Sequence, residues 1–417
     1  MSVLEPAQAM DVIVVGGGPV GLAAALALAQ VPCRVALVAR RQPYHDNRTS
    51  ALFGQSLSLL GRLGVWDDCA PHAAPLRVMR LVDDTGRLIR APEIRFHSGD
   101  IGQTEFGFNI ENSALVAALE AACNAQPGLT RFDAAATAVE STGTSGMVLT
   151  SDGRHLESPL IVGADGRQSI CRDAAGIALS RKALDQVALT FSVAHARPHE
   201  GVSTEFHTPE GPCVVVPLPG NRSSVVWVMR PARGNALLAM DDAALGIAFE
   251  RQTHSILGKA MVEGPRHLFP LAVERAGRLA AKRIVLAGEA GHGFPPIGAQ
   301  GLNLGFRDVT DLVRIVADTL PGGDDVGGAR LLSRYEAARR ADVLSRTTVV
   351  DLSNRLLLNA HLPAQVIRAA GVHLLGAFGP LRRLVMREGL SPGWRGQMSD
   401  RQTSGRDQPH HEGQRHE

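Results

Sequence analysis

The sequence predicts an α/β protein in which an antiparallel segment interrupts a parallel sheet. Short apolar runs pass directly into glycine-rich turns at residues 11–18, 160–166 and 283–291. Such runs are typical of parallel strands, which are buried on both faces. Residues 186–194 and 212–230 instead carry longer extended patterns. The second of these has two apolar runs around a Pro-Gly-Asn turn, which predicts a β-hairpin.

The composition of the 417 residues is that of an ordinary globular protein, with 45% hydrophobic and 20% charged residues. These values exclude a collagen-like, coiled-coil or largely disordered chain. At roughly 150 residues per domain, the length allows two to three domains. The net charge of +2 lacks the basic excess of a dedicated nucleic-acid binder, so we expect no nucleic-acid partner.

The cysteines favour a reducing compartment, because their number is odd and no two of them form a CxxC pair. They are Cys33, Cys69, Cys123, Cys171 and Cys213. We therefore expect a cytoplasmic protein. Residues 12–31 form an apolar run with the length of a membrane span, but the run lacks the basic start and the cleavage pattern of a signal peptide. Its internal glycines indicate a turn instead.

The first 38 residues predict one βαβ unit. Residues 11–15 and 34–38 are valine-rich runs that indicate buried strands, and residues 20–30 are rich in Ala and Leu and indicate a helix. Strands joined in this way are parallel, and the crossover is right-handed. The unit predicts a Rossmann-like domain at the start of the chain.

The turn between this strand and this helix has the spacing GxGxxG, formed by Gly16, Gly18 and Gly21. The first glycine permits the tight turn, the second lets a pyrophosphate approach the backbone, and the third allows close packing of helix on strand. Free amides and the helix dipole favour an anion at the helix start. The motif predicts a dinucleotide site, and a purely structural glycine turn is the alternative.

An acidic residue is expected at the end of the second strand, where it would bind the ribose hydroxyls. Ala39 stands there instead, followed by Arg40 and Arg41. The missing carboxylate weakens the contact with the ribose. Arg40 could substitute by touching the adenine or a phosphate, and the alternative is that both arginines are only solvated.

Two later blocks repeat the pattern of a buried strand that runs into glycine and an acid. One contains Asp165 and Gly166; the other contains Gly288 and Glu289, followed by a glycine-rich loop that opens a helix. Small residues let a flat ring lie against the backbone, and the amides of residues 302–304 can bind an anion at the helix start. We predict a second anion- and ring-binding turn in the same sheet.

The remaining segments predict the rest of the organisation. An antiparallel domain is expected at about residues 181–272, a helix over 304–320, and further helical structure over 331–386. Residues 396–417 have almost no apolar side chains and predict a disordered tail. The histidines of this tail are not expected to bind a metal, and no metal site is predicted elsewhere.

The three blocks, in this order, resemble those of the flavin-dependent aromatic hydroxylases, the single-component flavoprotein monooxygenases. In that family the second block is a GADG run followed by serine and arginine, matched here by Asp165, Gly166, Ser169 and Arg172. The third block is Gly-Asp-Ala-Ala-His followed by proline and Gly-Gln-Gly-x-Asn-x-Gly. Here Glu289 replaces the aspartate of that run.

Within this family, the chain looks most like the ubiquinone-biosynthesis hydroxylase branch, over about residues 10–390. Residues 296–308 carry the strongest match, and residues 46–51 and 109–112 also fit. The implied domains are the first part of a Rossmann-like FAD-binding domain (1–180), an inserted antiparallel-sheet substrate domain (181–272), the last part of the FAD-binding domain (273–330), a C-terminal helical region (331–395) and the disordered tail (396–417).

The resemblance also implies which residues hold FAD. The glycines of the first turn would bind the pyrophosphate, with Arg48 near it or near the flavin, and Glu289 would approach the ribityl chain. The block at Asp165 serves both FAD and NAD(P)H in the family, although a plain turn or cap role is the alternative. Backbone amides of Leu302 and Asn303 would lie near the pyrimidine end of the ring. The implied cofactor-binding set is Gly16, Gly18, Val20, Gly21, Arg40, Arg48, Asp165, Gly166, Gly288, Glu289, Pro296, Gly298, Gln300, Gly301, Leu302 and Asn303.

The implied activity is hydroxylation of an aromatic ring, and the expected substrate is a polyprenylated ubiquinone precursor. NAD(P)H or another donor reduces the FAD, and O₂ then gives a flavin C4a-hydroperoxide that transfers a hydroxyl group. No catalytic side chain is assigned, because the cofactor does the hard chemistry while the protein places the ring and excludes water. The substrate would lie between the flavin and the second domain. Leu189, Phe191 and Val215 are candidates to line it, and His292 is more simply a loop histidine than a proton carrier.

Three alternatives stay open. The substrate could be a small soluble phenol. A flavoprotein of this fold could instead halogenate its substrate or reduce a double bond. The chain could also be a catalytically impaired, flavin-binding accessory subunit of a quinone-biosynthesis complex, which Ala39 and Glu289 would favour.

A basic segment suggests a further partner. Residues 351–395 hold six arginines against two acidic residues, a net charge of +4, interleaved with apolar positions. A basic amphipathic helix can rest on the inner face of a membrane or on a partner protein. A helical cap over the core with a solvated basic face is an equally good interpretation.

Overall fold

The structure is a computed structural model that describes residues 8–41, 48–86, 90–295 and 300–358, with side chains described in these ranges except at residue 300 and residues 346–358. Several predictions concern parts of the chain outside the described residues. They are the roles of Pro296 and Gly298, the disordered tail at 396–417, and the amphipathic character of residues 351–395.

A mostly parallel sheet forms the centre of the first part of the fold. Its strands, in spatial order, are β19 (Ala280–Ala281), β20 (Ile284–Leu286), β13 (Leu160–Gly163), β2 (Val12–Val15), β3 (Val35–Val38) and β9 (Leu129–Phe132). All neighbours are parallel except β19 and β20. Each of the four buried strands expected beside a glycine-rich turn or in the first βαβ unit is confirmed.

The helix after the first glycine-rich turn is buried on every side. This helix, α1 (Pro19–Ala29), packs against β2 and β3 and also against α4 (Asn112–Ala125) and α8 (Gln300–Thr319). Residues 21–29 of α1 are all buried. Its sequence is apolar all round and rich in alanine, as a helix enclosed by other elements requires. The predicted βαβ unit is therefore confirmed, and it occupies the centre of the core.

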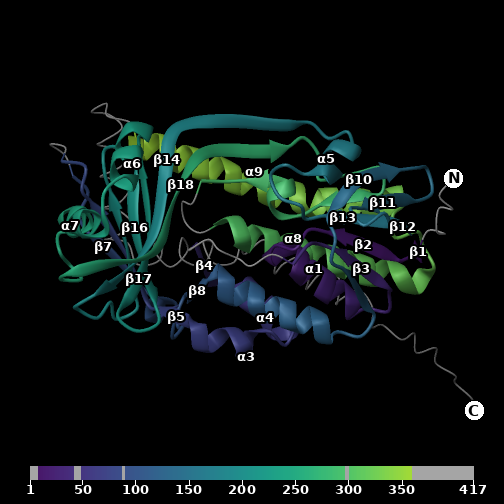
Figure 1. Cartoon of the computed structure of the whole chain (residues 1–417), viewed down its shortest axis with the longest axis horizontal. Coiled ribbons are helices and arrows are strands. Elements are labelled where there is room, and N and C mark those ends of the chain that lie inside the picture. The colour runs from purple at the N-terminus through teal and green to yellow at the C-terminus, as the bar shows by residue number, and fades with distance from the viewer. Residues whose placement is uncertain (1–7, 42–47, 87–89, 296–299, 359–417) are drawn as a thin grey trace, which may run out of the picture.

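A second, larger sheet lies beside this unit (Figure 1). Its strands, in spatial order, are β21 (His292–Gly293), β18 (Ala260–Ala276), β14 (Leu179–His195), β17 (Arg222–Met229), β16 (Pro212–Leu218), β15 (Val202–His207), β6 (Val78–Asp83) and β7 (Ile94–His97). The hairpin expected over residues 212–230 is confirmed as β16 and β17. In Figure 1, β14 and β18 run from the first part of the fold to the far end of this sheet.

Not every strand of the second sheet comes from the predicted insert. Strands β6 and β7 come from residues 78–97, which we assigned to the first part of the FAD-binding domain, and β6 pairs in parallel with β15. Parallel pairing between segments more than 100 residues apart leaves no local signal in the sequence. The boundary at residue 181 itself stays a prediction.

The remaining elements cover these two sheets. Two small sheets contain β1 (Gln8–Ala9), β12 (His155–Ser158), β11 (Gly146–Thr150) and β10 (Ala136–Ser141), and β4 (Thr49–Phe53), β8 (Gly107–Glu111) and β5 (Ala73–Leu76). Further helices are α2 (Gly54–Arg62), α3 (Trp66–Cys69), α5 (Ile170–Ala174), α6 (Pro231–Leu238), α7 (Asp242–Gln252) and α9 (Ala329–Leu358). Single 3₁₀ turns are η1 (Ala70–His72), η2 (Ser98–Ile101), η3 (Gly288–Ala290) and η4 (Leu320–Gly322).

Two helices differ from their predicted limits. Helix α8 begins at Gln300, four residues before the expected start, because the glycine-rich segment before residue 304 forms its first turn. Helix α9 begins at Ala329, two residues before the expected start, and confirms the expected helical structure as far as Leu358; the rest of the prediction, residues 359–386, lies outside the described residues. Leu302 and Leu331 both pack on the core, which explains why the helices extend to these positions.

A fully buried carboxylate joins the last helix to the third glycine-rich block. Asp308 on α8 accepts hydrogen bonds from the backbone amide of Gly288 at 2.9 Å, from Nε2 of His292 at 2.7 Å and from Nε of Arg339 at 2.6 Å. Arg339 also donates to Asp311 and Asp342. Helices α8 and α9 and turn η3 are therefore held by one network of charges in the interior.

The network fixes the charge of Asp308. Burial alone would raise the pKa of this carboxyl group, but the neighbouring His292 and Arg339 outweigh burial and lower the pKa from 3.8 to about 2. The same carboxylates, against the effect of burial, raise the pKa of Arg339 above its ordinary value. Both groups therefore stay ionised at neutral pH.

Replacing Arg339 with leucine should destabilise the protein strongly. The side chain of Arg339 is 0% exposed, so its removal takes away the buried positive charge that the three carboxylates share. We expect Arg339→Leu to lower the free energy of unfolding by about 3–5 kcal/mol. Arg334→Leu, on the same helix, removes an ion pair with Asp318 at an arginine that is 38% exposed, and it should cost less than about 1 kcal/mol. Equal losses in urea unfolding would contradict the structural role of the network.

The network should also give an acid-dependent stability. The pKa of Asp308 is lower in the folded chain than its ordinary value of 3.8, so its contribution is present above that pH and is lost as the pH falls toward about 2. A shift of this size corresponds to about 2 kcal/mol. We expect the free energy of unfolding of the wild type to fall more steeply over this pH interval than that of Asp308→Asn, measured by urea titration. Parallel curves would count against the shifted pKa.

Candidate cofactor and substrate site

The glycines of the first turn occupy three different environments. Gly16 has a φ of +122°, and a Cβ atom there would lie 2.2 Å from the carbonyl oxygen of Ala164. A Cβ at Gly21 would lie 2.0 Å from the carbonyl oxygen of Gly16, whereas a Cβ at Gly18 would have no neighbour within 4 Å. The first and third positions are therefore closed by backbone, and the second faces open space, as the motif predicts.

The amino end of α1 has the features of an anion-binding site. Gly18 is the N-cap, and its lack of a side chain leaves the helix start without a side-chain cap. Pro19 occupies the first helical position, where no amide hydrogen is needed. The free amides of the first turn and the helix dipole point out of this end, next to the open side of Gly18. A pyrophosphate is the group that fits such a cradle.

Ala39 lies at the end of β3, where an acidic residue was expected to bind the ribose. Ala39 is buried there, and its Cβ would lie 2.8 Å from a Cβ at Gly17. Arg41 is engaged elsewhere, since its backbone amide donates to Asp133 and its guanidinium donates to Asn124, both at 2.6 Å. Arg40 is exposed at the strand end, so a contact of this residue with the cofactor stays a prediction.

The second block lies directly against the first. The Oδ2 atom of Asp165 accepts from the backbone amide of Cys171 at 3.1 Å, and its Oδ1 atom is buried with no partner in the described part of the chain. An unpaired buried carboxylate oxygen needs a donor, and a sugar hydroxyl supplies one. Ser169 caps α5 by accepting from the amide of Arg172, as a cap residue would. Arg172 in turn donates to the carbonyl oxygen of Ala290 at 3.2 Å, which joins the second block to the third.

Val20 brings the third block against the first turn. A Cβ at Gly288, which has a φ of +62°, would lie 3.1 Å from a methyl group of Val20, and a Cβ at Gly305 would lie 2.6 Å from the same methyl group. The valine therefore fits between turn η3 and helix α8 only because both neighbours are glycines. Residues from three distant parts of the sequence meet at this point.

Glu289 faces outward from turn η3 and forms an ion pair. Its Oε1 atom accepts from Nε and a terminal nitrogen of Arg167 at 3.3 and 3.2 Å, and its side chain is 47% exposed. Arg167 also lies 3.9 Å from Glu274, whose side chain is 5% exposed. The extra methylene of Glu289 is thus used to reach an arginine of the second block. Its contact with a cofactor stays a prediction.

The first turn of α8 offers backbone donors rather than side chains. The amides of Gly301, Leu302 and Asn303 belong to the first helical turn, which has no intrahelical acceptors for them. The side chain of Asn303 is already used: it donates to the carbonyl oxygen of Ala51 at 2.7 Å and accepts from Ser56 Oγ at 2.7 Å. Asn303 therefore ties α8 to β4 and α2 through its side chain. Gln300 opens the same helix.

FAD fits this arrangement of residues. The uncapped start of α1 suits the pyrophosphate, the unpaired oxygen of Asp165 suits a hydroxyl of the ribityl chain or ribose, and the start of α8 suits the electron-rich end of the flavin ring. Gly166, with a φ of +77°, leaves open space beside Asp165. The cofactor-binding role of each residue stays a prediction that the geometry supports.

Strand β4 connects this region to the large sheet. The guanidinium of Arg48, just before β4, lies over the ring of Phe269 on β18, 5.5 Å from its centre. Thr49 Oγ1 lies 2.8 Å from Ser224 Oγ on β17, within hydrogen-bond distance. Arg48 is thus placed where the large sheet meets the cofactor side, rather than at the turn after β2. The sheet face that carries Ser224 and Phe269 is the one turned to β4.

The three residues expected to line the substrate lie on the opposite face of this sheet. Leu189, Phe191 and Val215 are buried in a core formed with α6 and α7, and the ring of Phe191 meets that of Phe249 edge to face at 6.1 Å. Leu189 and Phe191 do share one face, as their spacing predicts. The predicted role of this face is wrong, because these residues pack against α6 and α7. Strand periodicity groups residues on one face, but it does not show which element covers that face. These residues stabilise the sheet and do not face the cofactor side.

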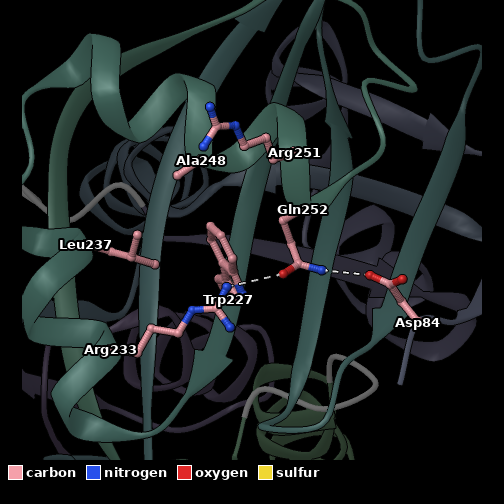
Figure 2. A pocket seen from close by; sticks show the side chains of 7 residues that line it. All are labelled: Asp84, Trp227, Arg233, Leu237, Ala248, Arg251 and Gln252. Atoms are coloured by element: carbon pink, nitrogen blue, oxygen red, sulfur yellow. Dashed lines mark hydrogen bonds between the residues drawn. The ribbon is translucent and has the colours of Figure 1, made fainter. Parts of the chain in front are cut away.

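One cavity of about 330 Å³ opens on this helix-covered face (Figure 2). Its lining residues are Asp84, Trp227, Arg233, Leu237, Ala248, Arg251 and Gln252. In Figure 2 the amide of Gln252 lies between the guanidinium of Arg233 and the carboxylate of Asp84, and it donates to the latter at 2.9 Å. The cavity lies between the sheet and α6 and α7, away from the glycine-rich turns, so it is no part of the candidate site.

The face turned to β4 was not predicted from the sequence as a place for a ligand. It carries Thr190 and Ser192, the polar residues that alternate with Leu189, Phe191 and Val193 along β14. Ser192 pairs in register with Ser224, which contacts β4. The alternation of polar and apolar positions was the available signal, since a strand with two different faces presents its polar side to a different environment.

Several further observations limit the chemistry. Within the described ranges, no group of three His, Cys, Asp or Glu residues is placed to hold a metal ion. All five cysteines are buried free thiols. None of the described helices combines the length and the apolar character needed to cross a bilayer. His292, which we expected to be a loop histidine, lies on β21 and is a buried partner of Asp308.

Comparison with known proteins gives a consistent result. The family model described as FAD binding domain matches residues 9–348. The ubiquinone hydroxylase UbiL of Rhodospirillum rubrum is 33% identical over 387 residues, which are 91% of this chain and 89% of that protein. The 3-demethoxyubiquinol 3-hydroxylase of Escherichia coli is 29% identical over 92% of this chain and 99% of its own length. The crystal structure of p-nitrophenol 4-monooxygenase PnpA from Pseudomonas putida DLL-E4 superposes with a TM-score of 0.75 at 19% identity, covering 96% and 100% of the two chains, which supports the fold.

Two alanine substitutions should separate folding from cofactor binding at the first turn. Gly21→Ala places a methyl group against a backbone oxygen, so we expect it to destabilise the apoprotein by about 2–3 kcal/mol. Gly18→Ala meets no neighbouring atom, so it should change apoprotein stability by less than about 1 kcal/mol. It should weaken FAD binding by about tenfold or more, because the methyl group fills the space needed by the pyrophosphate. Thermal unfolding and FAD fluorescence titration measure the two effects, and unchanged FAD affinity in Gly18→Ala would contradict this placement.

Proposed function

The chain belongs to the FAD binding domain family, and on this premise we propose that it is an FAD-dependent monooxygenase that hydroxylates the aromatic ring of a polyprenylated ubiquinone precursor. The observation that carries the proposal is the likeness to ubiquinone hydroxylases over nine-tenths of the chain. The convergence of three glycine-rich blocks, an arrangement that suits FAD, supports it.

The residues of this chain have defined tasks in that reaction. When bound, FAD supplies the redox chemistry: with NAD(P)H or another donor and O₂, one oxygen atom enters the ring and the other leaves as water. The start of α1 would bind the pyrophosphate, and Asp165 would accept a hydrogen bond from a hydroxyl of the cofactor. The amides at the start of α8 would stabilise negative charge on the flavin ring. The Asp308 network would hold η3 and α8 in the positions that these contacts need.

The substrate ring would lie between the flavin and the face of the large sheet that is turned to β4. An apolar cluster on that face suits an aromatic ring with a hydrocarbon tail, and it consists of Ala188, Val226, Val228, Leu271 and Leu184. A site at the junction of two structural parts, walled by apolar side chains, is where small-molecule pockets usually form. The family likeness and this cluster support a lipid-tailed substrate.

We further propose where the protein works. A polyprenylated precursor resides in the bilayer, so an enzyme without a membrane-crossing helix among its described residues must reach it from the surface. The basic segment at residues 351–395 is suited to the inner face of the membrane or to a quinone-biosynthesis complex. A cytoplasmic, peripheral enzyme is the proposed arrangement.

Isotope labelling tests the reaction. The FAD-loaded protein is incubated with NADH or NADPH, a prenylated phenol and heavy-oxygen-labelled O₂. We expect one labelled oxygen atom in the product and consumption of reductant that depends on the phenol. Gly18→Ala at sub-saturating FAD should lose activity that excess FAD restores. Reductant consumption without a hydroxylated product would contradict the monooxygenase assignment and favour an impaired accessory subunit.

Deletion of the gene tests the substrate class. Mass analysis of the quinone pool should show loss of ubiquinone and accumulation of a precursor that lacks one hydroxyl group. Complementation with the wild type should restore the pool, and Arg339→Leu should serve as an unstable comparison. An unchanged quinone pool, with activity on a small soluble phenol in a membrane-free extract, would contradict the ubiquinone assignment.

A further inference from the structure

Three buried hydrogen-bonding groups without partners gather on the face of the large sheet that is turned to β4. They are Oγ1 of Thr190, Oγ of Ser192 and Nε2 of His267, none of which has a hydrogen-bond partner in the described part of the chain. Thr190 is 7% exposed and Ser192 is 2% exposed. An unpaired buried polar group lowers the stability of the folded protein, so its presence needs an explanation. Three such groups on one face indicate a common explanation.

Strand register places these groups together. Thr190 on β14 lies directly opposite His267 on β18, and opposite residues of neighbouring strands share a face. The neighbours Leu189, Phe191 and Val193 point into the core under α6 and α7. The side chains of Thr190 and Ser192 therefore point the other way. The polar groups form one patch, and they are not scattered defects of packing.

The patch lies next to the candidate cofactor region. The ring of His267 stacks on that of Phe269 with 5.9 Å between centres, and Arg48 lies over the same phenylalanine. Ser224, the register partner of Ser192, contacts Thr49 at the start of β4. The carbonyl oxygen of Ala51, also on β4, accepts from Asn303 at the start of α8. A short chain of contacts thus leads from the patch to the helix start that suits the flavin.

The chemistry of the patch matches a phenol better than a hydrocarbon. A serine or threonine hydroxyl both donates and accepts a hydrogen bond, and a histidine ring nitrogen does either according to its tautomer. A phenolic hydroxyl also donates and accepts. The aromatic ring of Phe269 and the apolar side chain of Val226, the register partner of Thr190, border these groups and suit the ring that carries the hydroxyl.

We propose that Thr190, Ser192 and His267 bind the hydroxyl substituent of the aromatic substrate and so orient its ring toward the flavin. This inference rests on the function proposed above and names the residues that select the substrate. None of the three groups has a hydrogen-bond partner among the described residues, and the substrate hydroxyl is the partner that this proposal assigns to them. A site built to bond a hydroxyl discriminates strongly against an analogue that lacks one.

Binding and stability, measured on the same variants, test the inference. Thr190→Val, Ser192→Ala and His267→Phe each remove the polar atom and keep most of the side-chain shape. The FAD-loaded protein is titrated with ortho-prenylphenol and with its methyl ether, and the change in flavin absorbance reports binding. Ser223→Ala is the matched control: Ser223 is buried on the helix-covered face and lies 3.0 Å from Nε2 of His195, within hydrogen-bond distance.

We expect each of the three variants to raise the dissociation constant of the phenol by about tenfold and to leave that of the methyl ether nearly unchanged. Thr190→Val and Ser192→Ala should unfold at the same temperature as the wild type or higher, because each removes an unpaired buried group. Ser223→Ala should lower the unfolding temperature without changing phenol affinity. A purely structural role for Thr190 and Ser192 would give the opposite combination.

The outcomes distinguish this inference from the proposed function. Wild-type phenol affinity in all three variants, with a normal response of the wild type, would overturn the inference and leave the proposed function intact. A lower unfolding temperature in Thr190→Val and Ser192→Ala would also overturn it, since the hydroxyls would then be structural. A wild-type protein that responds to neither ligand would contradict the proposed substrate class, and the inference would fall with it.

Discussion

The structure depends on the pairing of one buried negative charge. The buried carboxylate of Asp308 accepts hydrogen bonds from a backbone amide of η3, a histidine of β21 and an arginine of α9. A carboxylate in the interior is tolerated only when it is paired and hydrogen-bonded, so these segments can adopt their places only together. The conformation of the third glycine-rich block therefore depends on Arg339 of α9, which lies 51 positions after Gly288 in the sequence. The stability of the fold and the geometry of the candidate site are linked at this point.

Small residues allow the uncharged segments around the candidate site to pack closely. Glycines at the first turn and at η3 let backbones and Val20 approach at distances that any side chain would block, and the alanines of α1 let the helix sit between the sheet and two other helices. Close approach leaves the amide groups at the starts of α1 and α8 as the polar surface of the site. A site made of backbone amides suits a reaction in which the cofactor supplies the chemistry and the protein supplies position.

The large sheet divides stability and recognition between its two faces. The face under α6 and α7 carries an apolar core, in which Phe191 packs against Phe249. The face toward β4 combines an apolar cluster with Thr190, Ser192 and His267, whose polar atoms have no partner in the described chain. Stability on one face can compensate for unpaired polar groups on the other, which is the balance expected where a protein keeps a binding function at the expense of stability.

Elements with local signals can be predicted from the amino-acid sequence alone. The strands beside each glycine-rich turn, helix α1, the β16–β17 hairpin and the grouping of Leu189 with Phe191 all follow from residues adjacent in the chain. Contacts between distant segments are visible only in the folded chain. They include the pairing of β6 with β15, the ion pair of Glu289 with Arg167, and the hydrogen bond from Asn303 to β4. The sheet face that is available to a ligand follows from such contacts as well. The periodicity of a strand assigns its residues to one face or the other. The element that covers a face comes from elsewhere in the chain, and its position depends on packing and charge pairing across the whole molecule.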